Sequence, residues 1–479
     1  MQLPVCSVER VAEDFAGIDL GDPRRGRRVR KVVASLARRP SAPLPFALRD
    51  EAEVEGAYRL MNNPHVDFHK LAAAHANATR KRAEKTGDVI VVHDTTTLTF
   101  EDLEGEKIGF LQTGKPGFLF HVSLVLDATA WRRPLGVIHG ETIHRKKRSN
   151  RGGKKKPSGT ETASWDNRES KRWWRGMEAA GKALADCQSV LHVADREGDS
   201  YELMEQLLAS EQRFVVRVRV NRRGRADATE AGWSTVKEVV AGCEGKLERE
   251  VPLSSRSKKS APNMNRAHPP RSGRVAKLRF SATRIEIPRP QYLKDPIAKT
   301  ISLNLVHVTE YDTPAGESPV EWLLYTTEPT ATSDQIASVV DTYRARWTIE
   351  EFNSCLKTGC AYESREFQSR HALLNMLALS LPVACELLWL RSRARDCPKA
   401  PATDVLSLSQ IKLLRSLGRR KLSDSATARD ALLAVAGLGG HLKNNGEPGW
   451  KVLARGMQLL LAYDTAWHEG RRSVGAPNL

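Results

Sequence analysis

The sequence predicts an α/β protein with a central sheet, a β-rich insertion and helical regions at both ends. Apolar, β-branched runs typical of buried strands recur in the first half of the chain: 88–94, 118–128, 134–143 and 189–195. Short alternating strands then follow one another from about 221 to 319. Residues 1–75 and 371–479 are instead rich in helix-forming stretches. We therefore expect a core formed by 76–220 and 320–370.

The net charge of the chain indicates what kind of molecule it binds. The 479 residues carry a net charge of +18, from 75 Lys and Arg against 57 Asp and Glu. Such a surplus favours a polyanion, and nucleic acid is the usual one. The sequence shows no secretory signal and no apolar run near the roughly 18 residues that span a bilayer. Seven scattered cysteines without a CxxC pair indicate a reducing cytosol. A metal site built from Cys355, Cys360 and His371 is therefore disfavoured.

The N-terminal region contains a dense cationic helix. It is predicted to begin at Pro23 with Asp22 as its N-cap. A second helix, within 51–63, carries Tyr58 and Arg59, which suit stacking and phosphate pairing. We favour DNA contact by the cations of both helices over a merely solvated face. The cations of the first helix are Arg24, Arg25, Arg27, Arg28, Arg30 and Lys31.

Two predicted strands deliver an aspartate at their ends. Residues 88–94 end on Asp94 and residues 189–195 end on Asp195. A carboxylate at the end of a buried strand needs a partner, because an unpaired buried charge costs several kcal/mol. Each aspartate has a structural alternative: Asp94 can cap the following T-T-T, and Asp195 can pair with Arg196 or cap the next helix. Strands 118–128 and 134–143 extend the first strand into an antiparallel meander, with a turn at 131–134.

Further basic segments follow the meander. Residues 145–156 form a low-complexity basic loop, and 169–185 form a helix. The alternating strand 213–220 puts Arg217 and Arg219 on the same side as Arg213. The interval 254–274 is basic and contains proline.

The stretch from Asp341 to Gly359 is predicted to be one helix, since glycine first occurs at its end. At about 100° per residue, four polar side chains fall within roughly 60° of one another. They are Tyr343, Arg346, Glu350 and Lys357. Ile349, Phe352 and Leu356 form the opposite, apolar face. Glu351 points about 100° away from the polar group, so Glu350 is the better candidate for chemistry. The alternative is an ordinary amphipathic helix.

Three carboxylates in a basic protein suit two-metal phosphodiester chemistry. Asp94, Asp195 and Glu350 offer the hard oxygen ligands that hold two Mg²⁺ ions about 3.5–4 Å apart. Arg346 and Lys357 then bind phosphate, the arginine bidentately and the lysine as a point charge.

With these motifs the chain resembles the DDE transposases of the bacterial insertion-sequence-four family. The resemblance is carried by Y-x2-R-x3-E-x6-K from Tyr343 to Lys357, and by segments that include H-D-T-T-T-L, D-R-E and E-W-L-L-Y-T-T. It implies a ribonuclease H-like catalytic core with a β-rich insertion. It also implies Asp94, Asp195 and Glu350 as the catalytic metal ligands for two Mg²⁺, with Mn²⁺ able to substitute.

The resemblance further implies partners and roles. Tyr343, Arg346 and Lys357 would hold phosphate, and Trp322 would help flip a base during hairpin formation. The N-terminal domain, 1–75, would recognise terminal inverted repeats. The C-terminal helices, 371–479, would support a homodimer on paired double-stranded DNA ends before insertion into target DNA. A bacterial cytoplasmic location at the nucleoid is expected.

Two alternatives remain on the sequence alone. The first is a non-catalytic DNA-binding inhibitor of transposition, which would have no chemical use for three carboxylates. The second is a general ribonuclease H-like nuclease, which would need neither the insertion nor paired ends.

The basic loop 145–156 generates a first prediction. Neutralising Lys146, Lys147, Lys154 and Lys155 together should reduce the slope of log K against log salt, with little change in sequence preference. Each phosphate contact that is lost removes about 0.9 from that slope. Filter binding of DNA at several salt concentrations measures it, and an unchanged slope would exclude the loop from DNA contact.

Overall fold

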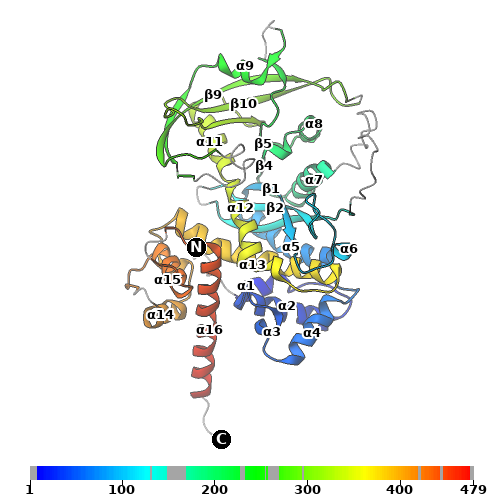
Figure 1. Cartoon of the computed structure of the whole chain (residues 1–479), viewed down its shortest axis with the longest axis vertical. Helices are drawn as coiled ribbons and strands as arrows, with labels where there is room; N and C mark the ends of the chain where they lie inside the picture. The colour runs from blue at the N-terminus through cyan, green and yellow to red at the C-terminus, as the bar shows by residue number, and fades with distance from the viewer. Residues whose placement is uncertain are drawn as a thin grey trace. The chain divides into compact units, whose positions relative to one another are not determined.

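A computed structural model describes residues 8–129, 132–147, 169–226, 232–253, 255–256, 269–293, 296–418, 422–442 and 446–474. The chain forms two compact units (Figure 1). Unit 1 contains residues 1–172, 176–189 and 347–479, and unit 2 contains 173–175 and 190–346. Most of the basic interval 254–274, and the basic loop beyond Lys147, lie outside the described residues.

The sheet of unit 1 is the predicted antiparallel meander. It consists of β1 (Asp88–Thr99), β2 (Gly117–Asp127) and β3 (Pro134–Ile143), with β2 in the middle. The prediction that the first strand ends on Asp94 is wrong. The β-branched Thr95, Thr96 and Thr97 continue the strand, and Asp94 is paired with Val122 near its centre. The capping alternative for Asp94 is therefore wrong as well.

Helices precede this sheet as predicted. Asp22 caps α2 by accepting a hydrogen bond from the Arg24 amide. Arg28 packs against α4, where a Cβ on Gly56 would lie 1.8 Å from its Nη1 and would displace the guanidinium. The five helices are α1 (Val8–Glu13), α2 (Pro23–Arg38), α3 (Leu44–Ala47), α4 (Glu51–Met61) and α5 (Phe68–Thr86).

Later segments complete unit 1. They are α6 (Gly105–Ile108), η2 (Glu169–Lys171), most of α7 (Arg172–Ala183), α12 (Trp347–Ser354), η4 (Cys355–Gly359), η5 (Tyr362–Ser364), α13 (Arg370–Asp396), η6 (Ala402–Asp404), α14 (Leu408–Leu417), α15 (Ala428–Leu438) and α16 (Trp450–Val474). α13 is long and apolar enough to cross a bilayer, contrary to the estimate from sequence, but 94% of its apolar window is buried within the protein. That burial is typical of a core helix.

Unit 2 is built on a mixed sheet in the order β4-β5-β11-β10-β9-β6-β7, with β8 paired to β9. β4 and β5 are parallel, and the remaining pairs are antiparallel. This confirms the β-rich character predicted for 221–319. The strands are β4 (Ser189–Ala194), β5 (Arg213–Arg217), β6 (Arg223–Ala226), β7 (Ser234–Thr235), β8 (Leu247–Leu253), β9 (Arg274–Pro288), β10 (Thr300–Glu310) and β11 (Glu321–Thr326); the helices are η3 (Arg196–Gly198), α8 (Tyr201–Ala209), α9 (Val236–Ala241) and α11 (Ser333–Arg344).

The single helix predicted for 341–359 is instead three segments. α11 ends at Arg344, and the amides of Ala345 and Arg346 bond to carbonyls three residues back, which tightens the turn. α12 begins at Trp347 and passes into the π-helical turn η4, where the Cys360 amide bonds to the Cys355 carbonyl. A constant 100° per residue therefore does not apply from Tyr343 to Lys357. Ile349, Phe352 and Leu356 are nonetheless buried as predicted.

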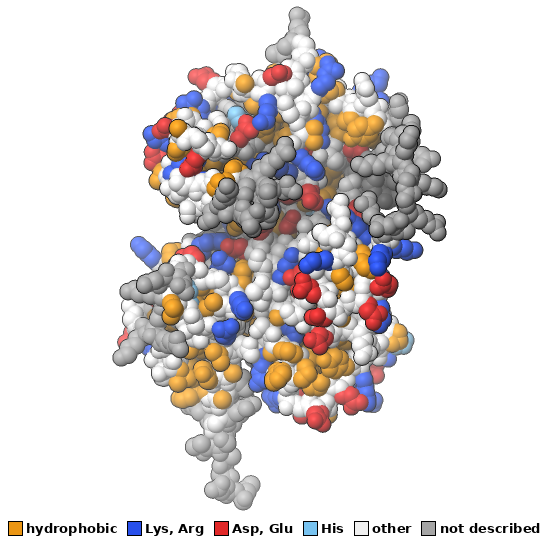
Figure 2. Space-filling view, viewed as in Figure 1, with side chains coloured by type: hydrophobic (Ala, Val, Ile, Leu, Met, Phe, Trp, Pro, Cys, Tyr) orange, Lys and Arg blue, Asp and Glu red, His pale blue; other side chains and the backbone are white. Residues whose placement is uncertain are grey.

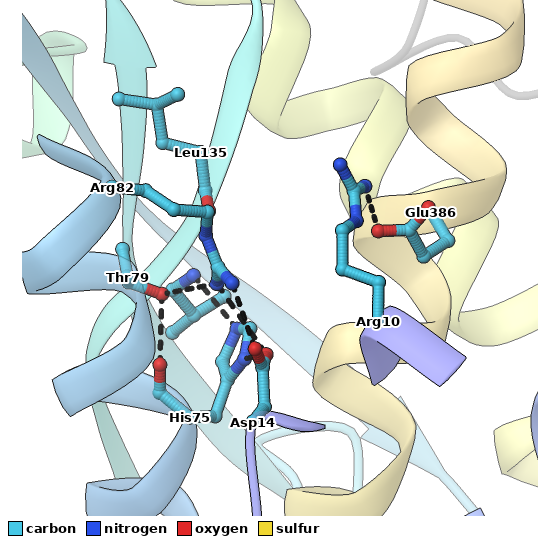
Figure 3. Close-up of polar contacts among 8 residues, drawn as sticks. Arg10, Asp14, His75, Thr79, Arg82, Leu135 and Glu386 are labelled. Atoms are coloured by element: carbon cyan, nitrogen blue, oxygen red, sulfur yellow. Dashed lines mark hydrogen bonds and ion pairs between the residues drawn. The ribbon is translucent and has the colours of Figure 1, made fainter. Parts of the chain in front are cut away.

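A buried polar network fixes the end of α1 on α5 and β3 (Figure 3). His75 Nδ1 contacts Asp14 Oδ2 at 2.6 Å, while His75 Nε2 accepts a hydrogen bond from the Val137 amide at 3.1 Å. Arg82 Nη1 donates to Asp14 Oδ1 at 2.7 Å, and Arg82 Nε donates to the Leu135 carbonyl. Since Nε2 accepts, Nδ1 carries the proton and His75 is neutral.

A second ion pair, Arg10 with Glu386, joins α1 to α13 beside this network. Burial lowers the pKa of His75, against the opposing effect of Asp14. Burial acts to raise the pKa of Asp14, but hydrogen bonds from His75 and Arg82 outweigh it and leave that pKa low.

This network generates a second prediction. The pKa of His75 is lower in the folded chain than its unfolded value of about 6.5, so the unfolded state binds more protons just below pH 6.5. The His75 contribution to stability is complete above pH 6.5 and is lost as the pH falls below it, by up to about 1.4 kcal/mol per pH unit. Urea unfolding of wild type and His75→Gln from pH 8 to 5 measures this. Identical pH dependence in both proteins would contradict the neutral His75.

Candidate active site

A hydrogen bond connects strand β1 to helix α12 in unit 1. Asn353 Nδ2 donates to Asp94 Oδ2 at 2.9 Å. Asn353 is buried, and within the described part of the chain its own Oδ1 is buried without a hydrogen-bond partner. The bond therefore fixes one oxygen of the predicted catalytic carboxylate from the helix that also carries Glu350.

The two neighbouring glutamates of α12 have different surroundings. Glu350 precedes Asn353 by one helical turn, so it lies on the side of α12 that faces Asp94. Glu351 is buried on another side and accepts a hydrogen bond from Arg395 of α13 at 2.6 Å. Glu351 thus belongs to the packing of α12 on α13, and Glu350 is the carboxylate directed towards β1.

Lys357 brings a cation to the same group. It lies on η4, half-buried, and burial lowers the pKa of its ammonium group, against the opposing effects of Glu363 and Asp94. Glu363 is anchored to β1 by accepting a hydrogen bond from the Thr99 amide at 2.8 Å. We call Asp94, Glu350, Asn353 and Lys357 the Asp94 cluster.

Asp195 lies in unit 2, directly after β4. Its Oδ1 accepts a hydrogen bond from the Glu197 amide at 2.8 Å and caps the short turn η3. Capping, which was one of the structural alternatives for Asp195, is therefore the role of one of its two oxygens. Its position at a strand end confirms the prediction made from 189–195.

Other predicted phosphate-binding residues gather in unit 2 around a buried Tyr343. The rings of Trp322 and Tyr343 meet edge to face with centroids 5.3 Å apart, and the Arg217 guanidinium lies 5.7 Å from the Trp322 centroid. Burial raises the pKa of Tyr343; Arg217 and Arg346 oppose this rise, and Asp195 adds to it. We call Arg217, Trp322, Tyr343, Arg346 and Asp195 the Tyr343 cluster.

The remaining predicted DNA contacts belong to neither cluster. Arg24 is exposed on α2, whereas Arg25 is half-buried and donates to the Leu20 carbonyl at 2.6 Å. Arg59 on α4 is exposed and forms an ion pair with Glu55. Arg219 is exposed beyond the end of β5, and its amide donates to Asp199. The basic surface at the N-terminus is thus partly used for local structure.

Two residues of α12 were missed in the sequence analysis. Asn353 stands three residues after Glu350, a spacing that places both on one helical face and could have identified it. Trp347 is 60% exposed at the start of α12. An exposed indole is a suitable stacking surface for a nucleobase.

The chemistry of the Asp94 cluster fits a hard divalent cation. Carboxylate and amide oxygens are the ligands that Mg²⁺ and Mn²⁺ accept, and the Asn353 Oδ1 is a buried oxygen to which no described residue donates a hydrogen bond. Among the described residues, no three His, Cys, Asp or Glu side chains are grouped as a metal site. Asp94 and Glu350 belong to unit 1, and Asp195 belongs to unit 2.

Comparison with known families agrees with this chemistry. Residues 9–66 match the transposase DNA-binding family, which covers α1 to α4. Residues 166–383 match the transposase DDE domain. The second match includes Asp195, Glu350 and Lys357, whereas Asp94 precedes it. A DDE domain implies a ribonuclease H-like fold, in keeping with the mixed α/β architecture.

The contrast between the two glutamates generates a third prediction. Glu351→Gln should lower the free energy of unfolding by about 1–3 kcal/mol, because Arg395 loses a charged partner at a buried position. Glu350→Gln should lower it by less than Glu351→Gln does, because Glu350 is only half-buried. Urea unfolding measures both values. A larger loss for Glu350→Gln would contradict the structural assignment of Glu351.

Proposed function

We propose that this DNA transposase of the DDE type excises and inserts its element by a cut-and-paste route at terminal inverted repeats. The family matches support DNA transposition as the activity. The observation that carries the finer proposal is the Asn353–Asp94 hydrogen bond, which brings the strand of one predicted catalytic carboxylate to the helix of another.

Asp94, Asp195 and Glu350 are the proposed ligands of two Mg²⁺ ions, with Mn²⁺ able to substitute. When bound, such ions activate water or a 3′-hydroxyl for in-line attack and stabilise the leaving oxygen. The chain's own part is to hold these carboxylates on rigid elements, β1 and α12 among them. Nicking of one strand, hairpin formation, hairpin opening and strand transfer then follow as successive phosphodiester steps.

Cationic and aromatic side chains position the DNA strand. Arg346 and Lys357 are proposed to bind phosphate, and Tyr343 donates a hydrogen bond to it. Burial lowers the pKa of the Lys357 ammonium group, because it disfavours the charged form. A bound phosphate would stabilise the charged form again. Trp322 is proposed to assist base flipping at the hairpin, and the exposed Trp347 offers a second stacking surface.

A homodimer on paired DNA ends is proposed through the C-terminal helix. In Figure 1 the C-terminal half of α16 extends beyond α14 and α15. Leu459, Tyr463 and Trp467 recur every four residues along it and are 36%, 40% and 48% exposed. Figure 2 shows further hydrophobic side chains gathered over the helices of unit 1. An apolar stripe on one helix suits pairing with a second copy. The expected location is the bacterial cytoplasm, at the nucleoid.

The catalytic proposal makes a fourth prediction. Glu350→Gln should reduce Mg²⁺-dependent cleavage of element-end DNA at least 100-fold while leaving end binding unchanged, because it removes a metal ligand and no DNA contact. Gel assays of cleavage and of binding without metal measure the two effects.

Other results would favour the alternatives. Binding by the wild type without any nicking would support an inhibitor of transposition. Cleavage that does not require the terminal repeat would support a general nuclease.

The dimer proposal makes a fifth prediction. Replacing Tyr463 and Trp467 by glutamate should prevent complexes with two DNA ends while retaining single-end binding, because charge is unfavourable in an apolar interface. Light scattering and gel mobility with end DNA measure the assembly. Normal pairing by this variant would exclude the stripe as the dimer interface.

A further inference from the structure

We infer that Asn353 is a positioning residue for the metal site: its side-chain amide orients Asp94 for coordination. This inference deepens the proposed function and depends on it. Asn353 is not one of the four fixed positions of the motif from Tyr343 to Lys357. It is also not one of the three predicted carboxylates.

The hydrogen bond to Asp94 determines the orientation of the Asn353 side-chain amide. Asn353 Nδ2 donates to Asp94 Oδ2 at 2.9 Å. With the amide turned over, its oxygen would face a carboxylate oxygen and the hydrogen bond would be lost. The amide therefore presents its donor to Asp94, and the bond holds Oδ2 of that carboxylate against α12.

The side-chain oxygen of Asn353 gives independent support. Asn353 Oδ1 is buried and has no hydrogen-bond partner among the described residues. A buried carbonyl oxygen in that state is unfavourable unless another group satisfies it. Beside Asp94, and one turn from Glu350, the groups of suitable chemistry are a divalent cation and the water that it carries.

The position in α12 also explains why the constraint is stiff. Asn353 is only 7% exposed. Because its own side chain is enclosed by the protein, it has little freedom, and Asp94 is held before any metal binds. Partners of metal ligands commonly contribute 10–100-fold to metal affinity in this way.

The experiment measures Mn²⁺ affinity directly, by the paramagnetic resonance signal of free Mn²⁺ titrated with full-length protein without DNA. Asn353→Leu keeps the size of the side chain but cannot donate. Asn353→His places a ring N–H where Nδ2 stands. Glu350→Gln serves as a ligand variant.

Asn375 is a matched control. It is a fully buried asparagine of α13 whose Nδ2 donates to the Met61 and Val66 carbonyls, and its Oδ1 also lacks a partner among the residues that the structure describes. Asn375→Leu should therefore lower stability without changing the Mn²⁺ affinity.

We expect Asn353→Leu to weaken Mn²⁺ binding about 10-fold or more and Asn353→His to recover most of that loss. If Asn353→Leu binds Mn²⁺ with wild-type affinity while Glu350→Gln binds it more weakly, the inference about Asn353 would be overturned and the proposed function would stand. An equal loss in Asn375→Leu would also overturn it, since the effect would then be structural. Equal binding by wild type and Glu350→Gln, or none by the wild type, would contradict the proposed function and the inference together.

Discussion

The hydrogen bond from Asn353 to Asp94 is the constraint on which the candidate site depends. It joins β1 of the unit 1 meander to α12, and it does so at the carboxylate that the chemistry requires. Without it, Glu350 and Asp94 would be related only by the packing of a helix on a sheet. The neighbouring Glu351 differs from Glu350, because its hydrogen bond from Arg395 makes it part of the packing of α12 on α13.

Net positive charge has a different role from that of these carboxylates. The surplus of cations provides general attraction to a polyanion, but several of them also serve local structure. Arg25 closes the turn before α2, Arg28 fills the space above Gly56, and Arg82 holds Asp14 beside His75. Charge counted from the sequence therefore overstates the surface that is available to DNA.

Much of the fold could be predicted because its signals are local. Alternation and β-branching identified the meander and the insertion, and Asp22 before Pro23 identified the start of α2. The break at Ala345 and Arg346 could not be predicted, since no glycine or proline marks it and it is formed by backbone bonds of shorter span. The end of β1 was misplaced because Asp94 was taken as a terminator, although the three threonines after it favour a strand. Asn353 was missed because its role depends on a partner 259 residues away.

Localised oxidation of the protein backbone can show whether Asp94, Asp195 and Glu350 share a metal site. Fe²⁺ bound in place of Mg²⁺, with ascorbate and peroxide, generates radicals that cut the chain close to the metal. We predict cuts near Asp94, Asp195 and Glu350 that excess Mg²⁺ suppresses and that Glu350→Gln weakens. Cuts confined to other segments, or cuts at these positions that Mg²⁺ leaves unchanged, would contradict a shared metal site.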